Sequence, residues 1–175
     1  MKKIIIVFSI IFLFVYLTNV KGKEVVVPKE AIRLRVIANS NSEYDQKIKM
    51  KLSIEIEEEI TKLLKDTKNI AEARKIIKNN LQVLNMKVSE ILKKEGYKDT
   101  YKLTFGNAFF PEKKYKGIIY EKGYYETLLI TLGKGNGNNW WCVLFPPLCL
   151  MEANENETGE VEYKFFVKEL LEKYL

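Results

Sequence analysis

The sequence predicts a single α+β domain in which a mostly antiparallel sheet has two long antiparallel helices packed on one face. The order of patterns leads to this fold class: one short alternating segment, two long stretches of helical periodicity, then several alternating segments. The chain has 175 residues, which is enough for one domain with a real core. Its hydrophobic fraction of 47% and charged fraction of 30% are close to globular averages.

The N-terminus has the layout of a secretory signal. Lys2 and Lys3 precede an apolar run over residues 4–17, shorter than the roughly 20 residues that cross a bilayer. We expect residues 1–22 to be a signal peptide, with an uncleaved anchor as the alternative. Its removal takes away three lysines and no acid, so the net charge falls from +6 to +3. This mild charge argues against nucleic-acid binding, and residues 23–30 are expected to form an exposed N-terminal arm.

The single domain is expected to begin at residue 31, with a strand over residues 31–38. Apolar residues alternate there with Arg33 and Arg35, as on a strand with one buried face. The two arginines are therefore expected side by side on the other face. That face is either simply solvated or a binding face for an acidic or carbonyl-rich partner.

Two helices are expected next, over residues 43–65 and 70–95. Ser42 and Asn69 stand at capping positions, because each is followed three residues later by an acid. Apolar residues recur at steps of three and four along both segments, which gives each helix one buried stripe. Gly96 is placed to end the second helix. The short connection predicts an antiparallel pair that covers a sheet.

Further strands are expected over residues 101–105, 117–120, 125–132, 140–145 and 161–167, followed by a short amphipathic segment over 168–175. The second and third of these strands flank a turn that contains Gly123, the pattern of a β-hairpin. Phe109 and Phe110 are assigned to a connection. Pro146 and Pro147 are expected to end the fourth strand, because proline cannot donate to a ladder.

Residues 133–149, GKGNGNNWWCVLFPPLC, concentrate both tryptophans and both cysteines of the chain. The glycines do not form a phosphate loop, since no helix follows them, and are expected to allow positive φ in a turn that presents Asn138. Trp140 and Trp141 are adjacent, so in a strand they face opposite ways. At most one then lies fully in the core, and the other is a candidate contact residue unless the loop over residues 151–160 covers it.

The two cysteines leave two alternatives. Cys142 and Cys149 form a small disulfide ring in the exported protein, or they pack as buried thiols. So short a ring would fix local shape more than global stability.

The chain contains no histidine, which removes the usual activating base of serine and cysteine nucleophiles and the commonest metal ligand. Two cysteines alone cannot complete a structural zinc site. We expect no metal and no cofactor. A hydrolase of the cell envelope that uses a carboxylate pair stays open as an alternative class.

Two stretches carry a resemblance to a known family: residues 31–46, AIRLRVIANSNSEYDQ, and residues 136–150, NGNNWWCVLFPPLCL. Both resemble the stage II sporulation protein R family of endospore-forming bacteria, and the similarity extends over nearly all of residues 25–170. One departure is that longer family members have an acidic insertion where this chain has only residues 151–160.

The resemblance implies a secreted signalling protein without a reaction of its own, with residues 31–175 as its signalling domain. Such a protein is made in the forespore and exported into the septal intermembrane space, which brings it transiently near a membrane. Its implied partner is a membrane-embedded aspartic protease, the stage II sporulation protein GA, which processes pro-sigma-E in the mother cell. The residues expected to contact this partner are Arg33, Arg35, Asn39, Asn138, Trp140 and Trp141, with Cys142 and Cys149 shaping the surface.

Overall fold

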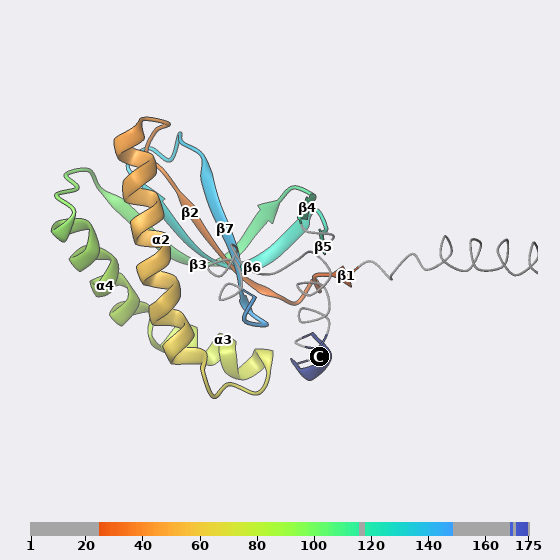
Figure 1. The fold of residues 1–175 in the computed structure, drawn as a ribbon. Helices are drawn as coiled ribbons and strands as arrows, with labels where there is room; N and C mark the ends of the chain where they lie inside the picture. The colour runs from red at the N-terminus through yellow and green to blue at the C-terminus, as the bar shows by residue number, and fades with distance from the viewer. Residues whose placement is uncertain (1–24, 116–117, 149–168, 170, 175) are drawn as a thin grey trace, which may run out of the picture.

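The computed structural model describes residues 25–115, 118–148, 169 and 171–174. The fold is α+β, as predicted, with a four-stranded sheet, helices packed against it, and a smaller sheet that extends from it (Figure 1). The predicted signal peptide over 1–22, the loop over 151–160 and the strand over 161–167 lie outside the described residues. No helix within the described ranges is long and apolar enough to cross a membrane.

The four-stranded sheet is mixed. Its strands, in spatial order, are β3 (Tyr101–Phe110), β6 (Gly123–Leu132), β2 (Ile32–Ile37) and β7 (Asn139–Phe145). The β3–β6 and β2–β7 pairs are antiparallel, but β2 and β6 are parallel. The prediction of a mostly antiparallel sheet holds for two of the three pairings. The parallel pair is possible because the helices and β3 supply the long crossover that it requires.

Three helices lie between β2 and β3, namely α2 (Glu43–Leu64), α3 (Ile70–Asn79) and α4 (Leu81–Lys94). The predicted caps are confirmed: the Ser42 side chain accepts from the backbone N–H of Asp45, and Asn69 accepts from that of Glu72. The first helix therefore begins where the sequence predicts.

The prediction of two long helices is wrong, because the second one is divided at Asn80. Its backbone N–H is shared between the carbonyls of Ile76 and Ile77, and its side-chain Nδ2 donates to the Ile76 oxygen at 2.8 Å. The side chain thus competes for a helical carbonyl, and Asn80 takes φ −105° and ψ 9°. The spacing of apolar residues by three and four continues across Asn80, so the sequence pattern does not reveal that α3 ends and α4 begins there.

The helices pack against the sheet through one hydrophobic core. The apolar positions of β2 and β6 face it, so the predicted alternation of β2 is confirmed for Ile32, Leu34 and Val36, all fully buried. The carboxylate of Glu57 on α2 is also buried. Burial, and after it the neighbouring Glu58, raises the pKa of Glu57, which is only 7% exposed.

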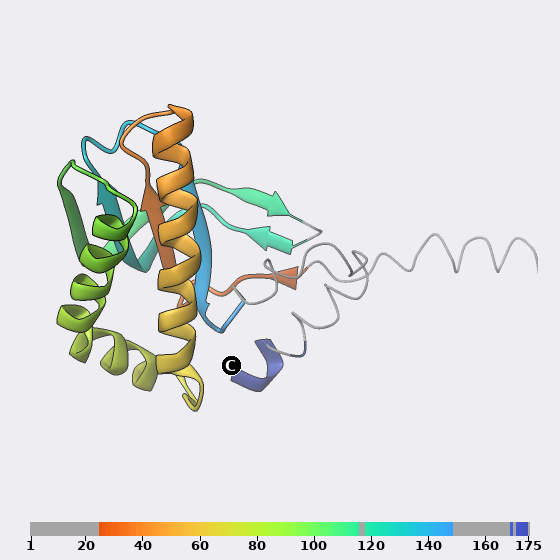
Figure 2. The same ribbon diagram turned by 60° about the vertical axis from the view of Figure 1, so that its left-hand side comes forward.

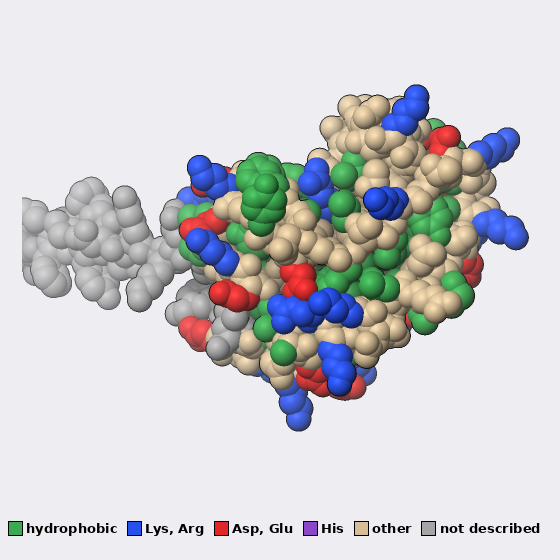
Figure 3. Space-filling model, turned by 180° about the vertical axis from the view of Figure 1, so that it is seen from behind, with side chains coloured by type: hydrophobic (Ala, Val, Ile, Leu, Met, Phe, Trp, Pro, Cys, Tyr) green, Lys and Arg blue, Asp and Glu red, His purple; other side chains and the backbone are tan. Residues whose placement is uncertain are grey.

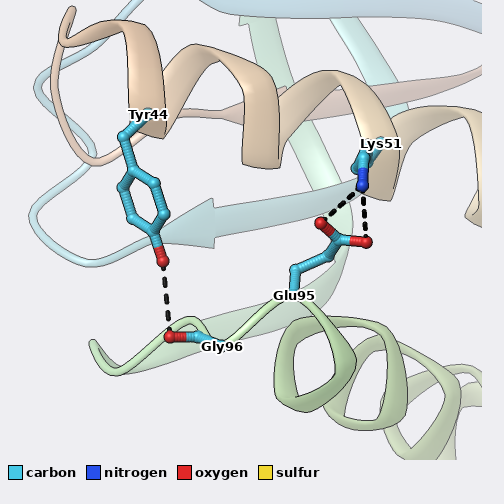
Figure 4. Close-up of polar contacts among 4 residues, drawn as sticks. All are labelled: Tyr44, Lys51, Glu95 and Gly96. Carbon is cyan, nitrogen blue, oxygen red and sulfur yellow. Dashed lines mark hydrogen bonds and ion pairs between the residues drawn. The ribbon is translucent and has the colours of Figure 1, made fainter.

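Polar contacts tie α2 to the end of α4 (Figure 4). The Lys51 ammonium lies 2.6 and 2.8 Å from the two carboxylate oxygens of Glu95. The Tyr44 hydroxyl donates to the Gly96 carbonyl at 3.4 Å. Gly96, which ends α4 as predicted with φ 68°, is thereby held against the first turn of α2.

The smaller sheet has the order β1 (Val25–Val26), β5 (Ile118–Tyr120), β4 (Lys113–Tyr115), and its β4–β5 pair projects away from the helices (Figure 2). Two predictions need correction. The arm over residues 23–30 is not wholly exposed, because β1 pairs with β5 and Val27 is fully buried. The predicted hairpin between the strands at 117–120 and 125–132 is not formed either, because β6 pairs with β3 along all ten residues, including Phe109 and Phe110.

Candidate functional site

Two turns meet at one end of the four-stranded sheet: the turn that leads from β2 into α2, and the glycine-rich turn before β7. The Asn39 Oδ1 accepts from the Lys134 backbone N–H at 2.9 Å, and the Asn41 Oδ1 accepts from the Asn138 N–H at 2.7 Å. The two stretches that resemble the sporulation family are therefore in direct contact. This contact could not be predicted from their spacing in the sequence.

Glycine is required where these turns approach each other. Gly133 and Gly135 have φ of 51° and 65°, which confirms the predicted use of positive φ. At Gly137 the reason is close approach: a Cβ there would collide with the backbone carbonyl of Ser40. The glycine-rich turn is shaped to fit the other turn.

A polar cluster fixes the turn that leads into α2. The Asp45 carboxylate accepts from the Ser40 hydroxyl at 2.5 Å and from the Asn39 amide at 3.4 Å. The Gln46 amide donates to the Ser40 carbonyl, and the buried Lys49 donates to the Gln46 side chain at 2.6 Å and the Asn138 carbonyl at 3.4 Å. Asn39, expected to contact a partner, is thus part of an internal network.

A groove of about 640 Å³ lies beside this end of the sheet. The residues that line it are Arg33, Pro111, Lys113, Tyr115, Tyr120, Asn138, Asn139, Trp140, Trp141, Cys142 and Val143. They come from β2, from β7 and the turn before it, from the smaller sheet and from the connection between β3 and β4. Figure 3 looks at the molecule from behind and shows hydrophobic side chains gathered in the middle of this side, with Lys and Arg side chains around them.

Arg33 is buried, so the alternative of a simply solvated face does not hold for this arginine. It is 3% exposed, and its Cζ lies 3.5 Å from the centroid of the Tyr125 ring and 4.7 Å from that of Phe110. Burial lowers its pKa, although the nearby tyrosines Tyr125 and Tyr120 act in the opposite direction. Its Nε and Nη2 are buried without a hydrogen-bond partner.

Arg35 lies on the same side of β2 but in different surroundings. It is half-buried, and its Nε donates to the Asn139 Oδ1 at 2.9 Å while Nη1 donates to the Phe109 carbonyl at 3.3 Å. Burial lowers its pKa as well. The shared side of the two arginines is confirmed, but only Arg33 lines the groove.

The two tryptophans face opposite ways, as predicted. Trp140 packs against the core beneath the helices, whereas Trp141 packs edge-on against Phe110 with ring centroids 5.6 Å apart. The Lys113 ammonium lies 5.9 Å from the Trp141 ring, and the buried indole Nε1 has no hydrogen-bond partner. Both tryptophans are half-buried, so neither is fully in the core.

Cys142 is buried and disulfide-bonded, and no free cysteine occurs in the described part of the chain. Cys149 lies outside the described residues, so the pairing of the two stays a prediction. Among the described residues no group of three His, Cys, Asp or Glu side chains could hold a metal ion.

Sequence patterns did not indicate four of the residues that line the groove: Lys113, Tyr115 and Tyr120 from the smaller sheet, and Pro111 from the connection between β3 and β4. An alternating pattern identifies a strand but not its partner, so no local signal placed β4 and β5 opposite β7. The prediction did include five residues of the lining, because their residue types are unusual in their surroundings: Arg33, Asn138, Trp140, Trp141 and Cys142.

Comparison with known proteins identifies the class. The family model described as stage II sporulation protein R matches residues 28–155. The stage II sporulation protein R of Bacillus subtilis (strain 168) is 42% identical over 156 residues, covering 89% of this chain and 70% of that protein. No solved structure matches.

The structure described above is therefore that of a sporulation protein. The chain belongs to the stage II sporulation protein R family, and the expected resemblance is confirmed. The family match includes both turns and every residue that lines the groove.

Proposed function

We propose that this chain is a secreted signalling protein of sporulation that activates a membrane-embedded aspartic protease, the stage II sporulation protein GA. Activation leads to processing of pro-sigma-E in the mother cell. Membership of the stage II sporulation protein R family carries this proposal. The chain acts as a protein ligand from the septal intermembrane space, after export from the forespore through residues 1–22.

The groove is the surface through which the chain acts on its partner. It combines aromatic side chains with two cations, Arg33 and Lys113, and aromatic and arginine residues dominate the energetics of protein interfaces. Trp141 stands in its wall with a buried indole N–H that has no acceptor. A partner that supplies an acceptor there gains a bond that the isolated chain does not make.

An envelope hydrolase is the competing class. Glycoside hydrolysis requires two acids that face each other across a cleft. The described residues that line this groove include two cations and neither Asp nor Glu, which favours the binding role. Incubation of the purified exported chain with peptidoglycan tests the competing class, which predicts measurable release of soluble fragments.

Reconstitution in a non-sporulating host tests the proposed function. The host expresses the protease and its pro-sigma-E substrate, with or without this chain, and the processed fraction is measured on an immunoblot. Processing is expected only when the chain is present and exported. A chain that lacks residues 1–22 is the control, because it stays on the wrong side of the membrane. Equal processing without the chain, or with the control, contradicts the proposal.

A further inference from the structure

We propose that the edge of Arg33 and the indole of Trp141 form a binding site for a carboxylate from an acidic segment of the protein partner. The identity of the partner rests on the proposed function, but the carboxylate site itself does not. It is carried by Arg33 and Trp141, two residues that line one groove and have buried N–H donors without acceptors.

The Arg33 guanidinium is held between aromatic rings, and one of its edges has no hydrogen-bond acceptor. The ring centroids of Tyr125 and Phe110 lie 3.5 and 4.7 Å from its Cζ, so the two aromatic rings fix the orientation of the group. The atoms left without an acceptor are Nε and Nη2. These two nitrogens form one edge of the guanidinium, and this edge pairs with both oxygens of a carboxylate.

A second donor lies in the same groove. Trp141 Nε1 is buried and has no partner, and Phe110 packs against both the Trp141 ring and the Arg33 guanidinium. Lys113 is also in the lining, 5.9 Å from the Trp141 ring. The lining within the described residues thus offers positive charge and N–H donors with no acid to neutralise them.

The volume of the groove is sufficient for a peptide segment. Its 640 Å³ lies in the range of about 300–1,000 Å³ that is usual for ligand sites. A buried cation whose donors lack acceptors is unfavourable in the isolated chain. A partner that supplies acceptors for these donors would remove this unfavourable free energy.

The acid could also come from this chain, since residues 152–162 contain five glutamates. The described lining favours the partner, because it brings two cations, Arg33 and Lys113, and no acid to the groove. An acid from residues 152–162 is the alternative outcome of the test below.

NMR titration of the purified exported chain, labelled with ¹⁵N, tests the site. The probes are acetyl-Gly-Glu-Gly-amide, its Gln counterpart and inorganic phosphate. The signals are the Arg33 Nε–H and the Trp141 indole N–H, assigned with the Arg33→Lys and Trp141→Phe variants. The Glu peptide is expected to shift both signals saturably in the millimolar range, a usual affinity for so small a ligand. The Gln peptide is expected to shift neither.

The Arg33→Met variant should lose the response of Trp141 to the Glu peptide, whereas the Lys75→Met control should keep it, because Lys75 is exposed on α3. No shift, equal shifts with both peptides, or a response to phosphate alone overturns the carboxylate site. A variant with every glutamate of residues 152–162 changed to Gln tests the intramolecular source. If its two signals move without any peptide, the groove is filled by the chain itself and the proposal fails.

The processing assay separates this inference from the proposed function. If the wild-type chain binds the Glu peptide but never promotes processing, the carboxylate site stands and the proposed function fails. If Arg33→Met binds no peptide yet promotes processing as well as the wild type does, the assignment of the site to the protein partner is overturned.

Discussion

Replacement of Arg33 by methionine is expected to stabilise the isolated protein by about 1–3 kcal/mol. The two unpaired donors, Nε and Nη2, each cost roughly 1–3 kcal/mol in a buried setting. Stacking on Tyr125 and Phe110 offsets part of this, at about 0.5–2 kcal/mol for a cation–π contact. Methionine fills most of the same space and regains roughly 0.3–1.5 kcal/mol through sulfur–aromatic contacts.

The assay is unfolding by urea and by heat with the disulfide intact. For a chain of this length, 1 kcal/mol corresponds to a shift in Tm of about 2–4 °C. Arg35→Met is the matched control, because the Arg35 donors bond to Asn139 and Phe109 and their loss should cost about 1–3 kcal/mol. If Arg33→Met destabilises the protein by as much as Arg35→Met does, the Arg33 donors are satisfied in solution and the reasoning is refuted.

Three further predictions follow from the turns, the core and the cysteines. Gly137→Ala should destabilise by about 1–3 kcal/mol in urea denaturation because its Cβ meets a backbone carbonyl, whereas Gly106→Ala, with open space around it, should change little. Because the folded-state pKa of Glu57 is raised, Glu57→Gln should stabilise by up to ~1 kcal/mol at pH 7, a gain that disappears below pH ~4; equal gains at pH 3.5 and 7 would refute it. Mass spectrometry should show two hydrogens gained on reduction if Cys142 pairs with Cys149, and reduction should cost no more than about 2.5 kcal/mol.

Local signals in the sequence predicted the starts and ends of helices well. Ser42 and Asn69 cap α2 and α3 because a cap depends on only four consecutive residues. The break at Asn80 also has a local cause, but a stripe of helical periodicity on both sides conceals it. The sequence pattern therefore located the helical region and missed the change of direction within it.

Strand partners were harder to predict, because they depend on residues far apart in the chain. The alternation of β2 correctly assigned Arg33 to the side away from the helices. It could not show that Phe110 and Tyr125, from the far ends of β3 and β6, would cover the guanidinium. For the same reason the residues predicted to contact a partner include the side of the groove formed by β2, β7 and the turn before β7, but not the opposite side. Lys113 and Tyr120 reach it through a sheet pairing that has no local signal.

The most direct test of the account is the processed fraction of pro-sigma-E in the reconstituted host with Trp141→Ala. Trp141 is a better probe than Trp140, because Trp140 packs against the core beneath the helices and its loss would also affect stability. Met86→Ala is the control, because Met86 is 57% exposed on α4 and does not line the groove. With all three proteins exported in equal amounts, we expect processing with the wild type and Met86→Ala and a strong loss with Trp141→Ala. Processing by Trp141→Ala at the wild-type level would contradict the claim that the chain acts through this groove.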